Sequence, residues 1–128
     1  MSAPDEPGVH VVRAGNLSEA TAQTPGMTRR AGIDPSISRG LWVGRVATGP
    51  GFNSGVHHHG EAETVGHVLE GRARIRYGDG YKSFVDLDPG DFIYIGPYVP
   101  HIEENLSDTE PLEFVTIRSP DNIVVNLE

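Results

Sequence analysis

The stretch T-V-G-H-V-L-E-G-R-A-R-I-R-Y-G-D-G, residues 64–80, carries the clearest local pattern in the chain. In its second half, arginines alternate strictly with small, aliphatic and aromatic side chains. A period of two residues is typical of a strand with one face against a core. Glycine-containing turns at 70–71 and 78–80 bound the pattern, and G-D-G after an alternating strand is a hairpin signal. The stretch therefore predicts two strands, 64–69 and 72–77, in an antiparallel sheet.

The same pattern extends outward in both directions. The chain of 128 residues contains 16 glycines and 10 prolines, and turn signals recur every 8–12 residues without a long helical period. Further strands are expected at 9–13, 41–48, 81–87, 91–95, 101–105, 112–118 and 123–127. Such a series indicates an all-β, single-domain architecture, a barrel or jelly roll. We expect the barrel over 40–128, preceded by an extended N-terminal arm over 1–39 that is partly strand.

Composition excludes several function classes. The formal charge is −8, and the basic residues form only two short groups, so a nucleic-acid interface is not expected. No apolar run approaches the roughly 18 residues of a membrane span. The acidic start lacks the apolar segment of a secretory signal, and the chain has no cysteine. These features predict a cytoplasmic protein without disulfides or thiolate ligands.

A second stretch, G-V-H-H-H-G-E-A-E-T at residues 55–64, predicts a metal site. In an extended segment His57 and His59 share a face, and Glu63 follows close behind. His101 stands after P-Y-V-P, where proline restricts the backbone, and is the candidate for a further ligand. Three imidazoles and one carboxylate suit a divalent first-row ion: zinc, iron, manganese, nickel or copper. The alternative is a solvated histidine-rich loop.

Two motifs resemble those of the cupin superfamily. The first reads G-x5-H-x-H-x3,4-E-x6-G, and the residues that fit its first part are Gly51, His57, His59 and Glu63. The second reads G-x5-P-x-G-x2-H-x3-N, and the residues that fit it are Gly90, His101 and Asn105. The chain is also similar to stand-alone bacterial cupins that carry T-P-G-M upstream, here at 24–27. The resemblance implies a jelly-roll barrel (a double-stranded β-helix) and the same four metal ligands.

The carboxylate ligand departs from the motif. Counting back from V-L-E-G at 68–71 places the usual glutamate at Thr64, one residue past Glu63. A one-residue β-bulge near 63–64 would bring Glu63 to the metal. Otherwise Glu61 or no carboxylate would bind.

Two further residues are candidates for binding or catalysis. Arg45 shares a strand face with Leu41 and Val43, and if that face lines the barrel its guanidinium would bind a substrate carboxylate. His67 stands where an apolar residue or tyrosine is common, and could bind substrate or move protons. The alternatives are a solvated Arg45 and a packed or solvent-facing His67.

The resemblance implies a metal-dependent enzyme of small-molecule metabolism. Its substrate would be a small polar or chelating metabolite such as an amino acid, keto acid or N-hydroxylated amine. The reaction stays open between dioxygenase, decarboxylase, isomerase and lyase types or a rearrangement in biosynthesis. The alternative function is a non-catalytic, metal-containing cupin that binds or senses a small molecule. Because exposed sheet edges favour pairing of barrels, a homodimer is expected, with the segment before Gly40 crossing the interface.

Overall fold

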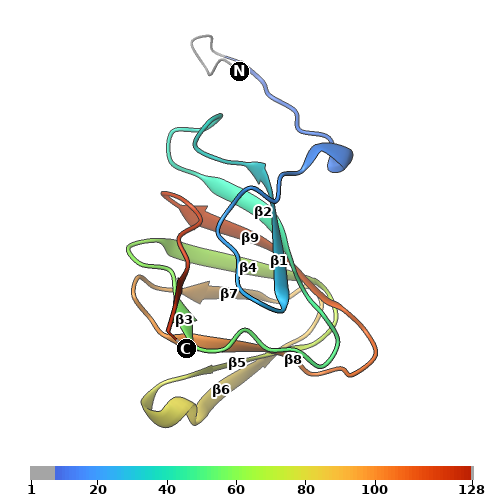
Figure 1. The fold of residues 1–128 in the computed structure, drawn as a ribbon, viewed down its shortest axis with the longest axis vertical. Coiled ribbons are helices and arrows are strands. Elements are labelled where there is room, and N and C mark those ends of the chain that lie inside the picture. The colour runs from blue at the N-terminus through green and yellow to red at the C-terminus, as the bar shows by residue number, and fades with distance from the viewer. Residues whose placement is uncertain (1–7, 128) are drawn as a thin grey trace.

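The computed structural model describes residues 8–127 and consists of two five-stranded antiparallel sheets (Figure 1). The first sheet has the order β1-β2-β9-β4-β7 and the second β10-β3-β8-β5-β6. The strands are β1 Met27–Ile33, β2 Trp42–Thr48, β3 His57–His58, β4 Glu63–Glu70, β5 Ala73–Tyr77, β6 Ser83–Leu87, β7 Phe92–Ile95, β8 His101–Asn105, β9 Leu112–Ser119 and β10 Val125–Asn126. Two short 3-10 helices, η1 Ala14–Asn16 and η2 Asp79–Tyr81, complete the described elements. The predicted all-β jelly roll is confirmed.

The N-terminal arm contributes a strand at a different place from the expected one. Residues 9–13 are not in a strand, whereas β1 forms the edge of the first sheet and pairs with β2 along its length. Met27 and Ala31 point into the core from β1. The alternation of buried and exposed positions in M-T-R-R-A therefore marks a strand that begins with an apolar residue and contains an arginine on its inner face.

The core lies between the two sheets and is built mainly from alternate residues of β1, β2, β4, β5 and β9. In β2 the inward positions are Trp42, Gly44, Val46 and Thr48. Gly44 is required there because a Cβ atom would lie 2.6 Å from the Trp42 ring and 2.5 Å from a backbone oxygen of β1. The other residues of the central apolar cluster are Met27, Ala31, Val68, Ala73, Ile75, Leu87, Leu112 and Phe114.

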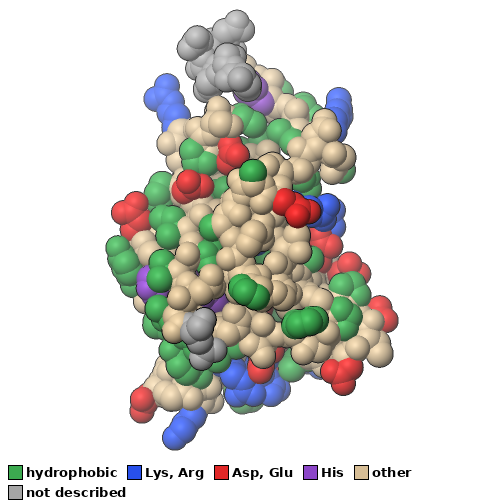
Figure 2. Space-filling view, viewed as in Figure 1, with side chains coloured by type: hydrophobic (Ala, Val, Ile, Leu, Met, Phe, Trp, Pro, Cys, Tyr) green, Lys and Arg blue, Asp and Glu red, His purple; other side chains and the backbone are tan. Residues whose placement is uncertain are grey.

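The arginines of β5 lie on the outer surface and are paired with acids. Arg74 donates to Asp86 at 2.8 Å, and Arg76 donates to Glu104 at 2.9 Å. The basic side chains visible in Figure 2 lie apart from one another rather than in one patch. Among residues 8–127, no helix has the length and apolar character that crossing a membrane requires.

Asn105, the last residue of the second motif, fastens the loops at one end of the barrel. Its amide nitrogen donates to the carbonyl oxygens of Thr48, Gly49 and Glu110, and its amide oxygen accepts from the Ser107 N–H. The side chain is buried. Asn105 therefore supports the turns at this end of the barrel.

We expect Asn105→Ala to lower the free energy of unfolding by about 2–4 kcal/mol, because it leaves buried carbonyl groups without a donor. Urea unfolding measures the change, and Asn16→Ala, at an exposed position of η1, is the matched control with an expected change within about 0.5 kcal/mol. Equal stability of the two variants would contradict this role.

Candidate metal centre

Three histidines from two strands and a loop converge inside the barrel. His57 on β3 is the cross-strand partner of His101 on β8, and His59 follows β3. All three are at most 2 % exposed, and their candidate ligand nitrogens lie within 4.8 Å of one another. His58 faces the other way and accepts a hydrogen bond from the Gly60 N–H at 2.9 Å. The expected alternation of the three consecutive histidines is therefore correct.

The backbone fixes the orientation of each inward imidazole. The Nδ1 atoms of His57, His59 and His101 lie 3.2, 2.8 and 2.9 Å from the carbonyl oxygens of Gly55, Ile123 and Val99, respectively. Because a carbonyl can only accept, each Nδ1 carries the proton and each Nε2 is an acceptor. Metal-binding histidines almost always donate their other ring N–H to a carbonyl or carboxylate oxygen in this way. The Nε2 of His59 accepts from the Arg118 guanidinium at 3.1 Å, so a metal ion there would replace that contact. The three residues can hold a metal ion.

The same burial keeps the imidazoles neutral. Removal from water lowers the pKa of His57 to about 3 and that of His101 to about 4, with a smaller contribution to His57 from the neighbouring His101. The pKa of His59 is lowered further by burial and by the Arg118 guanidinium. Neutral imidazole is the form that binds a metal, so the ligand set is ready at neutral pH.

The structure corrects the expected carboxylate ligand. Glu63 is exposed on the outer face of β4, where its carboxylate accepts from the Tyr94 hydroxyl at 2.9 Å. The β4–β9 register is regular at 63–64, and its irregularity lies between Val68 and Glu70. Without a bulge at 63–64, the inward position falls on Thr64, and Glu61 is also exposed. The histidine cluster within the described chain contains no carboxylate, in keeping with the last of the three alternatives drawn from the sequence.

The two candidate catalytic residues also lie outside the barrel. Arg45 is on the face of β2 opposite Trp42 and pairs with Glu113 on the outer surface. His67 occupies an outward position of β4 and stacks on Phe92, with ring centroids 4.2 Å apart. The two-residue period of the sequence separates the two faces of each strand. Which face is inside becomes clear only from the pairing with neighbouring strands. Neither residue is brought to the histidines.

Comparison with known proteins identifies the family. A family model described as a cupin domain matches residues 44–118, more than half of the chain. The chain belongs to the cupin domain family. No curated protein matches the sequence of this cupin.

Solved structures share its fold at low sequence identity. KdgF from Halomonas sp. has a TM-score of 0.69 and 16% identity over 88% of this chain and 94% of its own. An uncharacterized conserved protein with a double-stranded beta-helix domain from Klebsiella pneumoniae has a TM-score of 0.67 and 23% identity, covering 86% and 92%. An oxalate oxidase has a TM-score of 0.68 and 21% identity over 84% of this cupin, which spans 59% of that chain.

The interior of this cupin also contains three charged residues, of which sequence analysis missed the two arginines. Arg118 on β9 donates to Thr64 Oγ1 at 3.1 Å and to Asn122 Oδ1 at 2.8 Å, and its third nitrogen lies 3.1 Å from His59 Nε2. Arg29 on β1 and Glu103 on β8 face the same interior. A signal for Arg118 was present in the sequence. In the strand 112–118, Arg118 lies an even number of residues from the apolar Leu112 and Phe114, so all three share the inward face.

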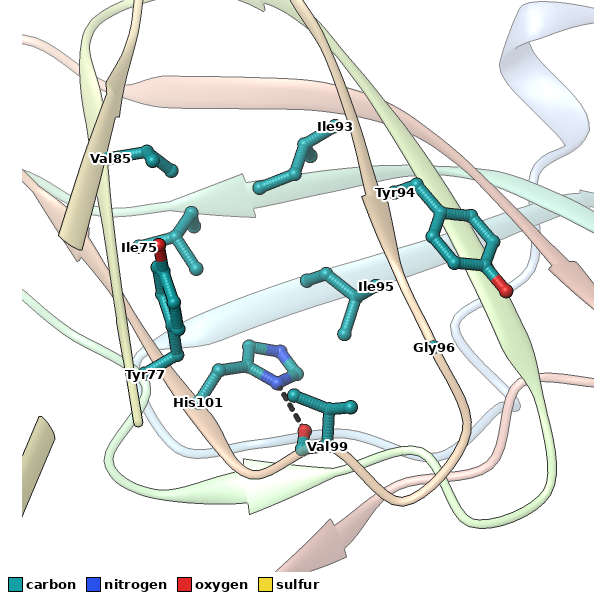
Figure 3. Close-up of a pocket in the computed structure, with 9 residues that line it drawn as sticks. All are labelled: Ile75, Tyr77, Val85, Ile93, Tyr94, Ile95, Gly96, Val99 and His101. Atoms are coloured by element: carbon teal, nitrogen blue, oxygen red, sulfur yellow. Dashed lines mark hydrogen bonds between the residues drawn. The ribbon is translucent and has the colours of Figure 1, made fainter. Parts of the chain in front are cut away.

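An apolar pocket of about 320 Å³ leads to the histidines (Figure 3). Ile93 and Ile95 point into it from β7, whereas Tyr94 points away. Ile75 and Tyr77 line the opposite side. His101 lies in the pocket wall and also belongs to the cluster, so a small molecule in the pocket would reach the candidate metal position.

Proposed function

We propose that this cupin is a metal-dependent enzyme that acts on a small polar or chelating metabolite. The observation that carries the proposal is the set of three buried imidazoles, each held by its Nδ1 proton, with their Nε2 atoms converging. Three protein ligands with an open fourth position are typical of catalytic rather than structural zinc sites. An amino acid, keto acid or N-hydroxylated amine fits the pocket size and could fill the open positions.

A bound ion would act as a Lewis acid on a substrate oxygen or lower the pKa of a bound water. The chain's own residues would orient the metal ligands and place charge beside them. The carbonyl partners hold the imidazole rings in place, and Arg118 lies against His59 with a fixed positive charge. Burial raises the pKa of Glu103, which accepts from the Thr48 hydroxyl at 3.1 Å, so its carboxyl group is suited to hold a proton within the interior.

The ligand set also bears on which ion binds. Imidazole nitrogens suit zinc, iron and nickel, whereas manganese favours oxygen ligands. Because Thr64 occupies the place of the motif glutamate, the site has only nitrogen ligands from the described chain. We therefore propose zinc, iron or nickel in preference to manganese.

Untagged protein purified without a metal resin is expected to contain about one first-row ion per chain by elemental analysis. Chelator treatment should lower the melting temperature, and Zn²⁺ should restore it at a lower concentration than Mn²⁺, since binding to the folded state alone stabilises that state. Metal-free protein with no thermal response to any of these ions would contradict the proposal.

A second candidate function is non-catalytic binding or sensing of a small molecule. It is favoured by the apolar lining of the pocket, in which Tyr77 and His101 are the titratable groups that face the space. A thermal-shift screen with chelating acids and hydroxylamines, followed by product analysis of each stabilising compound, separates the two functions. Stabilisation without any product in the zinc-, iron- and nickel-loaded protein would favour the binding module.

We also propose a homodimer, with the segment before Gly40 at the interface. β1 is an edge strand, and the N-terminal arm lies along its outer edge through a backbone pair between Ser18 and Ala31 and two hydrogen bonds between the Gln23 side chain and the Arg29 backbone. Phe92 on the outer face of the same sheet is 70% exposed, as expected for a surface that a second copy covers. Light scattering should give twice the chain mass, and removal of residues 1–16 or Phe92→Lys should shift it toward one. A monomeric wild-type protein would contradict this assembly.

A further inference from the structure

The inward face of the second sheet is buried at one end and reached by water at the other. Ile75 on β5 is 3% exposed, whereas Tyr77 and Val85, on the same inward face of β5 and β6, are 39% and 38% exposed. Val99, in the loop after β7, is also 39% exposed. This end of the barrel is the pocket of about 320 Å³ that leads to the histidines. Apolar and aromatic side chains that line a hollow and stay open to water are typical of a surface that a ligand covers.

The wall of this pocket offers few polar groups. β6 and β7 are edge strands of different sheets, and the pocket is lined by Val85 from one and by Ile93 and Ile95 from the other (Figure 3). None of the nine residues drawn around it in Figure 3 is an aspartate, glutamate, lysine or arginine. A second charge or a series of hydroxyl groups on a ligand would therefore lose water here without gaining partners, which is costly.

The sheet register sets where the metal-binding end of a ligand would lie. Tyr77, His101 and His57 are successive cross-strand partners on β5, β8 and β3. Adjacent strands lie about 4.8 Å apart, so the histidine cluster begins, at His101, one strand spacing from the pocket wall at Tyr77. A small molecule can therefore bind the metal with one end and keep the rest of its surface against the apolar wall.

We propose that the substrate joins a metal-chelating head to an uncharged apolar body, and that the pocket wall selects the body. The residues that select it are Ile75, Tyr77, Val85, Ile93 and Ile95. Keto acids and N-hydroxylated amines with an apolar side chain belong to this class, whereas sugars and small dicarboxylates do not. This inference rests on the proposed function and narrows its substrate. The physical basis is the removal of apolar surface from water, which is favourable in proportion to the area buried.

The test compares three hydroxamates that share a chelating head: acetohydroxamate, hexanohydroxamate and ω-aminopentanohydroxamate. The last two have bodies of equal length that end in a methyl group and an ammonium group, respectively. Titration calorimetry on zinc-loaded protein at pH 7.5 measures the affinities. Hexanohydroxamate should bind at least about 30-fold more tightly than acetohydroxamate, because it buries up to about four further methylene groups. It should bind at least about 10-fold more tightly than the ammonium compound, whose charge would lose water in the pocket. Equal affinity for hexanohydroxamate and either of the other compounds would overturn the inference.

Val85→Asp tests the wall by placing a charge in it. Val85 lies on an edge strand where water reaches it, so the variant should fold. The new carboxylate should pair with the ammonium group, and ω-aminopentanohydroxamate should then bind more tightly than hexanohydroxamate. Phe84→Asp, at the adjacent outward position that packs on Arg74, is the matched control and should keep the wild-type preference. Acetohydroxamate should bind both variants within about threefold of the wild type, since it does not reach the wall. A folded Val85→Asp protein with an unchanged preference would contradict the role of Val85.

Failure of this inference can be distinguished from failure of the proposed function. Zinc affinity is measured on the same samples by competition with a chromogenic chelator. If zinc binds but the hydroxamates do not differ, only the substrate class is wrong. If zinc does not bind, the compounds are compared on the metal-free protein by NMR chemical shifts, which detect weak binding. A preference for hexanohydroxamate there means that the metal enzyme is wrong and the selection of an apolar body stands, whereas no preference overturns both.

Discussion

Replacing His101 by glutamine is expected to weaken Zn²⁺ binding at least about 100-fold. The substitution removes one of three converging Nε2 atoms, and loss of even a hydrogen-bond partner of a metal ligand typically costs 10–100-fold. Competition with a chromogenic chelator measures the affinity. His57→Gln and His59→Gln should behave alike, because each removes a ligand from the same three-residue set.

The controls for this series are the two outward residues that the sequence placed among the candidates. Glu63→Gln and His67→Gln change a carboxylate and an imidazole on the outer face of β4. Both variants should bind Zn²⁺ within about threefold of the wild type, since neither side chain reaches the cluster. A loss at Glu63→Gln as large as that at His101→Gln would restore the four-ligand site and contradict the register of β4.

Acidification should strongly destabilise the metal-free protein between about pH 6.5 and pH 4. The unfolded imidazoles take up protons near pH 6.5, whereas folding lowers the pKa of His57 to about 3 and that of His101 to about 4. In this window the unfolded state binds more protons, so the free energy of unfolding falls as the pH falls. At pH 5 each buried imidazole contributes up to about 2 kcal/mol of this loss.

One buried group acts in the opposite direction. The pKa of Glu103 is raised by burial, so its proton uptake on folding offsets part of the loss. Because three imidazoles are buried and only one carboxyl group opposes them, the free energy of unfolding still decreases as the pH falls. Urea unfolding of chelator-treated protein at pH 7.5 and 5.0 measures it, and His101→Gln should show a loss about one third smaller. Equal or greater wild-type stability at pH 5.0 would show that the histidines are not buried as the structure has them.

Strand alternation predicted the strands of the barrel well because each has one buried face. β2, β4, β5, β8 and β9 lie within a residue or two of their expected bounds. β1 was missed because its inner face contains Arg29 between Met27 and Ala31, and an arginine at an inward position hides the apolar period.

The sequence by itself determined the all-β class, the two histidine-bearing segments and their alternation. These are local properties, since turn residues and a two-residue period depend only on neighbours along the chain. Only the tertiary structure decided which face of β2 and β4 is inside, and hence that Thr64 and Arg118 face the cluster while Glu63, Arg45 and His67 face outward. The reason is that shifting a strand by one residue leaves its pattern intact but exchanges its faces, and only pairing with neighbouring strands fixes that register.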